Sequence, residues 1–130
     1  SITNVFNGVK PFEKGKGTPP QTTQTMRDKP FVVEGSRPSG AHWMPLLRGS
    51  LIRRYVTLWN ENSWIKYGKW LAAPRDPGIF EAPAKIFVRQ TGDSIVATLG
   101  RPGFVARDNL HVILPGTYAI WRLLPPHRVV

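Results

Sequence analysis

Residues 85–114 read KIFVRQTGDSIVATLGRPGFVARDNLHVIL, and this stretch decides the fold that the sequence predicts. Short apolar and β-branched runs alternate in it with turn residues, which is the pattern of consecutive strands. Four strands are expected, at Ile86 to Gln90, Ile95 to Leu99, Phe104 to Ala106 and Leu110 to Leu114. Gly, Asp and Asn between them supply the backbone conformations that turns need. The stretch therefore predicts a small antiparallel meander.

Alternation along the first two strands predicts which face of the sheet is buried. Ile86 and Val88 share one face of the first strand, and Ile95, Ala97 and Leu99 share one face of the second. We expect these positions to face the core, because successive side chains of a strand point to opposite sides. Basic and amide residues stand beside them, at Lys85, Arg89, Gln90, Arg107 and Asn109.

The composition extends this prediction to the whole chain. A length of 130 residues suits one domain with a modest core, so residues 1–130 are expected to form a single domain. The 12 Gly and 13 Pro residues favour short elements and many turns over a helical bundle. The predicted fold is α+β and β-dominated: a small twisted antiparallel sheet, arranged as a meander, with short helices and long loops.

The excess of basic residues indicates an acidic partner. Lys and Arg number 18 against 8 Asp and Glu, which gives a formal net charge of +10. A field of this sign attracts polyanions, of which nucleic acid is the first expectation and an anionic membrane surface the second. A basic surface that serves only solubility is the alternative reading of the same charge.

Several classes of protein are disfavoured by what the sequence lacks. It has no cysteine, which excludes disulfides and cysteine-based zinc sites and is compatible with the cytoplasm, where we expect the protein to act. No apolar run approaches the ~18 residues of a membrane span, so no membrane association is expected. The histidines His42, His111 and His127 do not have metal-ligand spacing, and no nucleophile elbow or dinucleotide fingerprint is present. We expect no catalytic activity from this chain on its own.

Residues 1–30 contain few apolar side chains and predict an extended loop around Lys14 and Lys16. The segment Gly15-Lys16-Gly17-Thr18 is not a P-loop, because that motif needs a glycine where Lys10 stands. Glycines beside lysines allow a close approach to a phosphate backbone. A plain flexible linker is equally compatible with this composition.

The segment from His42 to Trp59 concentrates arginines near aromatic residues. Pro45 suits the first turn of a short helix and Gly49 its end, and a strand is expected from Tyr55 to Trp59. Arg48, Arg53 and Arg54 flank this strand. Guanidinium groups in such a cluster suit phosphates or guanine edges. They are equally suited to lie with their aliphatic stems over a small core.

The remaining elements are predicted from short local patterns. Phe31 to Val33 is expected to be a strand, and Pro77 to Phe80 a single turn that closes onto the main hairpin. The aromatic residues Trp64, Tyr67 and Trp70 are expected to build the core rather than to stack on bases. Tyr118 to Leu124 has the composition of a helix that Pro125-Pro126 would stop.

Four segments carry, in order, a resemblance to a known family. They are GVKPFEKGKGTPPQT (Gly8 to Thr22), MPLLRGSLIRRY (Met44 to Tyr55), IKYGKWLAAPRDPGIFEAPAKIFVRQTGD (Ile65 to Asp93) and DNLHVI (Asp108 to Ile113). Together they resemble the TaqI-like C-terminal specificity domain, the target-recognition domain of adenine-specific DNA methyltransferases and fused type II restriction-modification enzymes. The resemblance covers most of the chain.

The resemblance implies a division of labour with a second domain. In this family a separate Rossmann-like domain of the same polypeptide binds S-adenosylmethionine and carries an Asn/Asp-Pro-Pro-aromatic motif that receives a flipped adenine. The Pro-Pro pairs here, Thr18-Pro19-Pro20-Gln21 and Leu124-Pro125-Pro126-His127, lack the preceding amide or acid and the following aromatic. This chain is therefore expected to be a non-catalytic piece of a larger protein, without a cofactor, that binds double-stranded DNA. The family also continues into helices that pack beside the recognition sheet.

The candidate DNA contacts follow from side-chain chemistry. Phosphate contacts are expected at Lys14, Lys16, Arg53, Arg54, Lys69 and Arg75. Base reading is expected at Arg48, Arg89, Gln90 and Asn109, because Arg pairs with guanine and Gln or Asn with adenine in the major groove. Arg89 and Gln90 point to opposite faces of one strand, so at most one of them faces the groove. Two alternatives are a protein-interaction module that docks through the aromatic cluster and a stand-alone RNA-binding domain.

Overall fold

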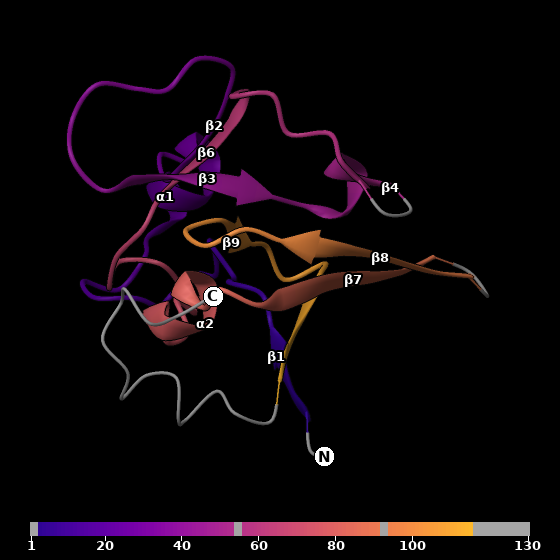
Figure 1. Cartoon of the computed structure of the whole chain (residues 1–130). Helices are drawn as coiled ribbons and strands as arrows, with labels where there is room; N and C mark the ends of the chain where they lie inside the picture. The colour runs from indigo at the N-terminus through magenta and orange to yellow at the C-terminus, as the bar shows by residue number, and fades with distance from the viewer. Residues whose placement is uncertain (1–2, 54–55, 92–93, 116–130) are drawn as a thin grey trace.

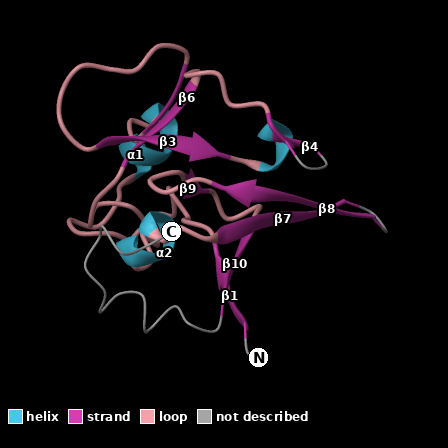
Figure 2. Ribbon diagram, viewed as in Figure 1, coloured by secondary structure: helices cyan, strands magenta, loops and turns pink. Residues whose placement is uncertain are grey.

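The computed structural model describes residues 3–53, 56–91 and 94–115 (Figure 1). Most of the regular structure in them is β-structure, with two four-stranded sheets, a two-stranded ribbon and three short helices. Long loops connect the strands, as Figure 2 shows by the extent of the pink segments. The predicted fold class, β-dominated with short helices and long loops, is confirmed.

The first sheet is antiparallel and contains the predicted hairpin. Its strands lie in the order β1 (Thr3–Asn7), β10 (His111–Pro115), β7 (Lys85–Thr91) and β8 (Ser94–Gly100). Strands β7 and β8 pair over their whole length, from Lys85 opposite Gly100 to Thr91 opposite Ser94. His111 is exposed in β10.

The second sheet contains one of the strands that were expected in the meander. Its order is β2 (Val32–Glu34), β6 (Ser63–Lys66), β3 (Trp43–Leu47) and β9 (Val105–Ala106). The strand expected at Phe104 to Ala106 is thus present as β9 but does not pair with β8. It runs parallel to the end of β3, where Val105 and Ala106 become fully buried. That burial explains why so short a strand pairs with β3 rather than with β8 of the first sheet.

The helix expected between Pro45 and Gly49 is wrong, because these residues end strand β3. Leu46 and Leu47 are buried there between β6 and β9. Pro45 pairs with Trp64 of β6 and has no partner in β9, so its missing N–H costs no hydrogen bond on that side. Gly49 begins the 3-10 helix η1 (Gly49–Leu51) instead of ending a helix.

The chain after η1 forms a small ribbon beside the hairpin. Strand β4 (Ile52–Arg53) pairs with β5 (Val56–Thr57), and both contact β8. The strand expected from Tyr55 to Trp59 is thus limited to β5 in the described residues. Figure 1 shows β4 above β8, on the side of the molecule to which the β7–β8 hairpin extends.

The core lies between the two sheets and includes the short helix α2 (Pro77–Glu81). Phe80, Phe87, Leu46 and Ile65 are among its largest fully buried side chains. The helix is capped by Asp76, whose carboxylate accepts a hydrogen bond from the Gly78 N–H, so the predicted turn at Pro77 is confirmed.

The aromatic residues between β6 and α2 belong to the core, as predicted. Trp64 is buried, and Tyr67 and Trp70 pack against the buried cluster. The Tyr67 hydroxyl donates to the Pro74 carbonyl at 2.7 Å. Burial raises the pKa of Tyr67 to about 12. These rings are therefore engaged within the protein.

The face of the β7–β8 hairpin expected to be buried is the exposed one. Ile86, Ile95 and Leu99 are 37%, 65% and 78% exposed, whereas Phe87 is fully buried and Thr98 is 5% exposed. The prediction failed because Phe87 is flanked by Lys85 and Arg89 on the buried face of β7, so the alternation favoured the more apolar face of Ile86 and Val88. We call the exposed side the outer face; its central row consists of Val5, Ile113, Ile86 and Leu99, which are aligned across the four strands.

The N-terminal region is more ordered than an extended loop. Thr3–Asn7 forms the edge strand β1, and Thr23–Asp28 forms helix α1, which Thr22 caps with a hydrogen bond to the Thr25 N–H. Val9 between them is fully buried. The strand expected at Phe31 to Val33 is present as β2, and the helix expected at Tyr118 to Leu124 lies outside the described residues. No helix within the described ranges is long and apolar enough to cross a membrane.

Candidate nucleic-acid interface

Three of the four residues expected to read bases meet around one buried glycine. The Gly49 N–H donates to the side-chain oxygen Oδ1 of Asn109 at 3.1 Å. A Cβ at Gly49 would lie 3.4 Å from Asn109 Nδ2 and 3.5 Å from Arg89 Cδ. Arg48 is the residue directly before the glycine. We call Arg48, Gly49, Arg89 and Asn109 the Gly49 junction.

The junction gathers side chains that are far apart in sequence. Arg48 follows β3 of the second sheet, Arg89 lies in β7 of the first, and Asn109 lies in the loop between β9 and β10. The departure of β9 toward β3 brings that loop to Gly49, because the Arg107 N–H donates to the Leu47 carbonyl at 2.8 Å. The pairing of β9 with β3 therefore positions the junction.

The two arginines of the junction keep unused hydrogen-bond donors. The Nε atoms of Arg48 and Arg89 are both buried and have no hydrogen-bond partner among the described residues. Because these Nε atoms are buried, a ligand cannot reach them directly, and any contact would come from the other N–H groups; the Arg48 side chain is 36% exposed. Arg48 also contacts Glu34, with Nη1 2.7 Å from Oε1. The junction can thus donate hydrogen bonds to an acceptor-rich partner.

The side chain of Asn109 already makes one hydrogen bond within the protein. Its oxygen accepts the hydrogen bond from Gly49, which leaves the Nδ2 hydrogens as the donors available to a ligand. Bidentate pairing with adenine uses both the oxygen and the nitrogen of an amide. As held here, Asn109 positions the backbone of the junction, and its oxygen keeps only one lone pair for a base beside the Nδ2 donors.

The other base-reading candidate and one phosphate candidate are not placed at the junction by described contacts. Gln90 lies in β7 opposite Ile95, and its side chain is outside the described part of the structure. Arg54 lies outside the described residues. The neighbouring Arg53 is exposed in β4, where its Nη1 donates to the carbonyls of Ser50 and Ile52, both at 3.2 Å.

A second basic surface, which we call the lysine loop, consists of exposed Lys14, Lys16 and Lys69. The Thr18 N–H donates to the Lys69 carbonyl at 2.9 Å and thereby ties the two segments together. Gly17 has a φ of +90° and lies so close to the Trp70 carbonyl oxygen that a Cβ would be only 2.4 Å away. Only glycine fits there without a shift of backbone, so the loop has a defined place against residues 69–70.

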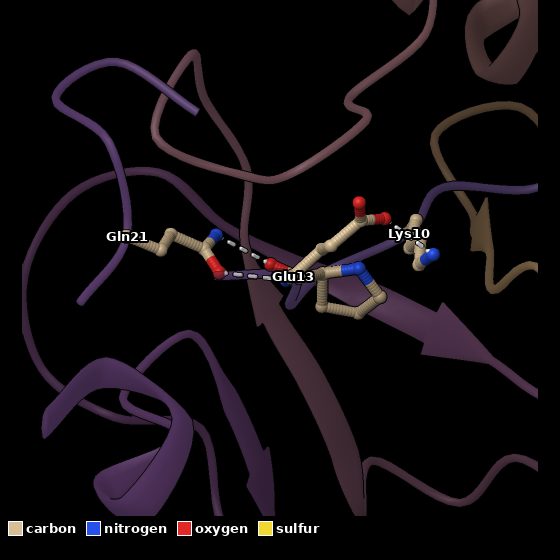
Figure 3. Close-up of polar contacts among 4 residues, drawn as sticks. Lys10, Glu13 and Gln21 are labelled. Atoms are coloured by element: carbon tan, nitrogen blue, oxygen red, sulfur yellow. Dashed lines mark hydrogen bonds and ion pairs between the residues drawn. The ribbon is translucent and has the colours of Figure 1, made fainter. Parts of the chain in front are cut away.

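Gln21 holds the lysine loop from inside, a role that sequence reasoning missed (Figure 3). Its side chain is buried, with Nε2 donating to the carbonyls of Pro11 at 2.8 Å and Trp70 at 2.9 Å. Its Oε1 accepts from the Glu13 N–H at 2.9 Å. None of these three contacts can be predicted from a local sequence pattern, because each depends on tertiary structure or on the bend of the loop. The contacts disfavour the plain flexible linker.

Arg75, the remaining phosphate candidate, serves the fold as well as the surface. Its Nε donates to the Gly8 carbonyl at 3.1 Å, and its backbone has a φ of +62°. The phosphate candidates that the structure describes therefore occupy separate places: the lysine loop, Arg53 beside η1, and Arg75 against Gly8. The lysine loop leads into α1, which Figure 1 shows on the opposite side of the view from β4.

The fold and these contacts define a small, basic, β-dominated domain whose arginines converge from two sheets. A family model, the TaqI-like C-terminal specificity domain, matches residues 44–124, which is more than half of the chain. The chain belongs to this family, and the resemblance seen in the sequence is confirmed. A search of curated proteins found no match. The family is a non-catalytic DNA-recognition domain associated with methyltransferases and restriction enzymes.

The matched residues include the whole Gly49 junction but not the first half of the lysine loop. Arg48, Gly49, Arg89 and Asn109 all fall within 44–124, whereas Lys14 and Lys16 precede it. Family membership therefore covers the junction together with Arg53, Lys69 and Arg75, and leaves out only Lys14 and Lys16 among these candidates.

Proposed function

We propose that this chain is the sequence-specific, double-stranded DNA recognition domain of an adenine-N6 DNA methyltransferase or restriction-modification enzyme. The observation that carries the proposal is the Gly49 junction, where two arginines from different sheets converge within the family's matched region. Arginine is the side chain that pairs most often with guanine O6 and N7 in the major groove. The net charge of +10 supplies the general attraction to the duplex.

We assign different tasks to the two basic surfaces. Lys14, Lys16 and Lys69 are exposed, carry full charges on a loop of fixed position and suit phosphate contacts. Arg53 suits the same task beside the junction. Arg48 and Arg89 suit base edges, because their guanidinium stems are partly buried and therefore held in place. Phosphate contacts would supply most of the affinity and the junction most of the discrimination.

Methyl transfer belongs, in this proposal, to another domain of the same polypeptide. The residues of this chain do not fit S-adenosylmethionine chemistry, because neither Pro19-Pro20 nor Pro125-Pro126 has an amide or acid before it and an aromatic after it. We therefore assign the cofactor and the flipped adenine to a catalytic domain, and the search for the target site to this one. Both would act on cytoplasmic DNA.

The test is binding to a mixed-sequence duplex across a salt series. Log affinity should fall linearly with log salt concentration, with a slope of about −0.9 for each phosphate neutralised. A single strand of the same sequence should bind more weakly, because a major groove is absent; preference for the single strand would favour the RNA-binding alternative. If the chain shows no salt-dependent binding even when it is joined to its catalytic domain, the proposed function is wrong.

A second role in protein contact is favoured by the outer face. The row Val5, Ile113, Ile86 and Leu99 is apolar and spans all four strands of the first sheet. In the aromatic cluster, by contrast, Trp64 is buried and Tyr67 and Trp70 are partly buried against the core. We propose that another part of the parent polypeptide covers the row, since solvent-exposed apolar rows of this kind mark contact surfaces. Slower hydrogen exchange of β8 in the parent protein than in this chain would support it; equal exchange would not.

A further inference from the structure

Glu34 is an acidic side chain that contacts the basic junction. It is the last residue of β2, and its Oε1 lies 2.7 Å from Nη1 of Arg48. Strand β6 lies between β2 and β3 in the second sheet, so Arg48 reaches past the start of β6 to make this contact. Both side chains remain partly exposed, and the pair is therefore accessible to a ligand.

We propose that Glu34 is a specificity-determining residue that makes Arg48 a base reader rather than a phosphate contact; this inference rests on the proposed DNA-binding function. Attraction to a phosphate depends on charge, and the carboxylate offsets the charge of the guanidinium. Hydrogen bonding to the neutral O6 and N7 of guanine depends on the direction of the donors. A guanidinium held at one nitrogen by Glu34 keeps other N–H donors for a base edge.

Arg53 provides the contrast within the same surface. Its Nη1 donates to two backbone carbonyls, which orient the guanidinium but leave its positive charge uncompensated. The two arginines near η1 are thus in different environments. Arg53 has no acidic partner in the described contacts and suits a phosphate, whereas the guanidinium of Arg48 is ion-paired and oriented and suits a base. Glu34 also repels the backbone of any duplex that does not present an acceptor to Arg48, which lowers the affinity for non-target sequences.

The experiment compares Glu34→Gln with the native chain, using two DNA probes. Glutamine keeps a side-chain oxygen that accepts from Arg48 but removes the negative charge. With a mixed-sequence duplex, we expect severalfold tighter binding and a log–log salt slope steeper by about 0.9, because Arg48 gains one phosphate contact. In a selection from a pool of duplexes with a randomised centre, the preference for guanine at one position should weaken.

Two controls separate this effect from a general change in charge. Asp28→Asn removes the same charge from exposed α1, away from the junction, and should alter the slope and the selected sequence little. Glu34→Gln in an Arg48→Gln background should no longer gain affinity, because the proposed effect acts through Arg48. Glu34 is more than half exposed as a side chain, so its amide variant should remain folded.

The outcomes distinguish the inference from the function on which it rests. Absence of salt-dependent duplex binding by the native protein would overturn the DNA-recognition function, and the inference with it. Binding by the native chain with a Glu34→Gln variant that matches Asp28→Asn would overturn the inference alone. A gain that persists without Arg48 would also overturn it, since Glu34 would then act on the DNA directly.

Discussion

The two faces of the first sheet have the opposite exposure to the one that hydrophobicity alone would predict. The outer face presents apolar side chains to solvent, among them Leu99 and Val5, which are 78% and 62% exposed. The buried face instead carries polar groups, including Lys85 and Thr98, beside Phe87. It also carries Arg89, which leads to the Gly49 junction. In the proposed function, the base-reading side chain of this sheet, Arg89, therefore lies on its polar, buried side.

The buried face accommodates two of its polar side chains through specific neighbours. The Lys85 ammonium donates to the Phe80 carbonyl at the end of α2 and lies 5.7 Å from the centre of the Phe87 ring. Arg89 lies against Gly49, where the absence of a Cβ leaves room for its stem. A sheet face can therefore serve as core and as support for a binding site at once, while its apolar outer face remains free for protein contact.

The largest expected effect is a difference in the free energy of unfolding between substitutions on the two faces. Phe87→Ala should lower the free energy of unfolding by about 3–5 kcal/mol, because it removes a fully buried ring from the core. Leu99→Ala, on the adjacent strand but exposed, should change it by about 0.5 kcal/mol or less. Urea denaturation of both variants measures the difference. A comparable loss for Leu99→Ala would mean that the outer face is covered in solution.

The next effect concerns the charge buried on the inner face. Burial lowers the pKa of Lys85 to about 8, from 10.5 in the unfolded chain. Between pH 8 and 10 the unfolded chain holds more protons, so stability should rise with pH, by about 2 kcal/mol over this range. Tyr67, with its pKa raised to about 12, opposes this trend only above pH 10, where stability falls as pH rises.

Lys85→Met tests this pH dependence. Methionine keeps an unbranched side chain of similar length but cannot titrate, so the rise between pH 8 and 10 should disappear. Denaturation midpoints measured at several pH values in that range check the result. A rise that survives the substitution would assign the titration to another group.

Much of the first sheet could be predicted because its signals are local. The β7–β8 hairpin follows from two apolar runs on either side of a four-residue turn, and α2 follows from Asp76-Pro77 at its start. The face of the hairpin could not be predicted, because Ile86 and Phe87 are both suited to a core. Which of them is buried depends on where the second sheet lies, and this is a non-local property.

The candidate site was predictable by chemistry but not by arrangement. Arg48, Arg89 and Asn109 were chosen for the bases that such side chains pair with, whereas their approach to Gly49 depends on β9 joining β3. Pro45 misled the prediction because proline suits both a first helical turn and a strand position that needs no donor. Glu34 was missed because nothing local links it to an arginine 14 residues later.

Among effects on DNA binding, the largest is expected at Arg89 on the inner face. Arg89→Gln should reduce discrimination at one base pair by about 1–3 kcal/mol, because one base edge loses its donors. The matched control is Arg27→Gln, which removes an exposed arginine from α1. Selection from a randomised duplex pool detects the difference. Equal weakening of every sequence would instead make Arg89 a phosphate contact.

Asn109 distinguishes positioning from reading at the junction. Asn109→Ala leaves the buried Gly49 N–H without its acceptor and should cost about 1 kcal/mol of stability. Asn109→Asp keeps the acceptor and should restore stability in urea denaturation. If the aspartate variant also keeps the selected DNA sequence, Asn109 only positions the junction. A change at one base pair would show that its Nδ2 hydrogens read a base.

The smallest effect is expected in the lysine loop, which lies outside the junction. Lys16→Ala should weaken binding to all duplexes alike, by about 1 kcal/mol or less, and should reduce the salt slope by about 0.9. Lys29→Ala, at the C-cap of α1, removes the same charge from an exposed position outside the lysine loop and serves as the control. Titrations at several salt concentrations separate the two, because a bound phosphate changes the slope whereas a distant charge does not. If Lys16→Ala shifted the selected sequence without changing the slope, the lysine loop would contact bases. The assignment of phosphate contacts to the lysine loop and of base contacts to the Gly49 junction would then be wrong.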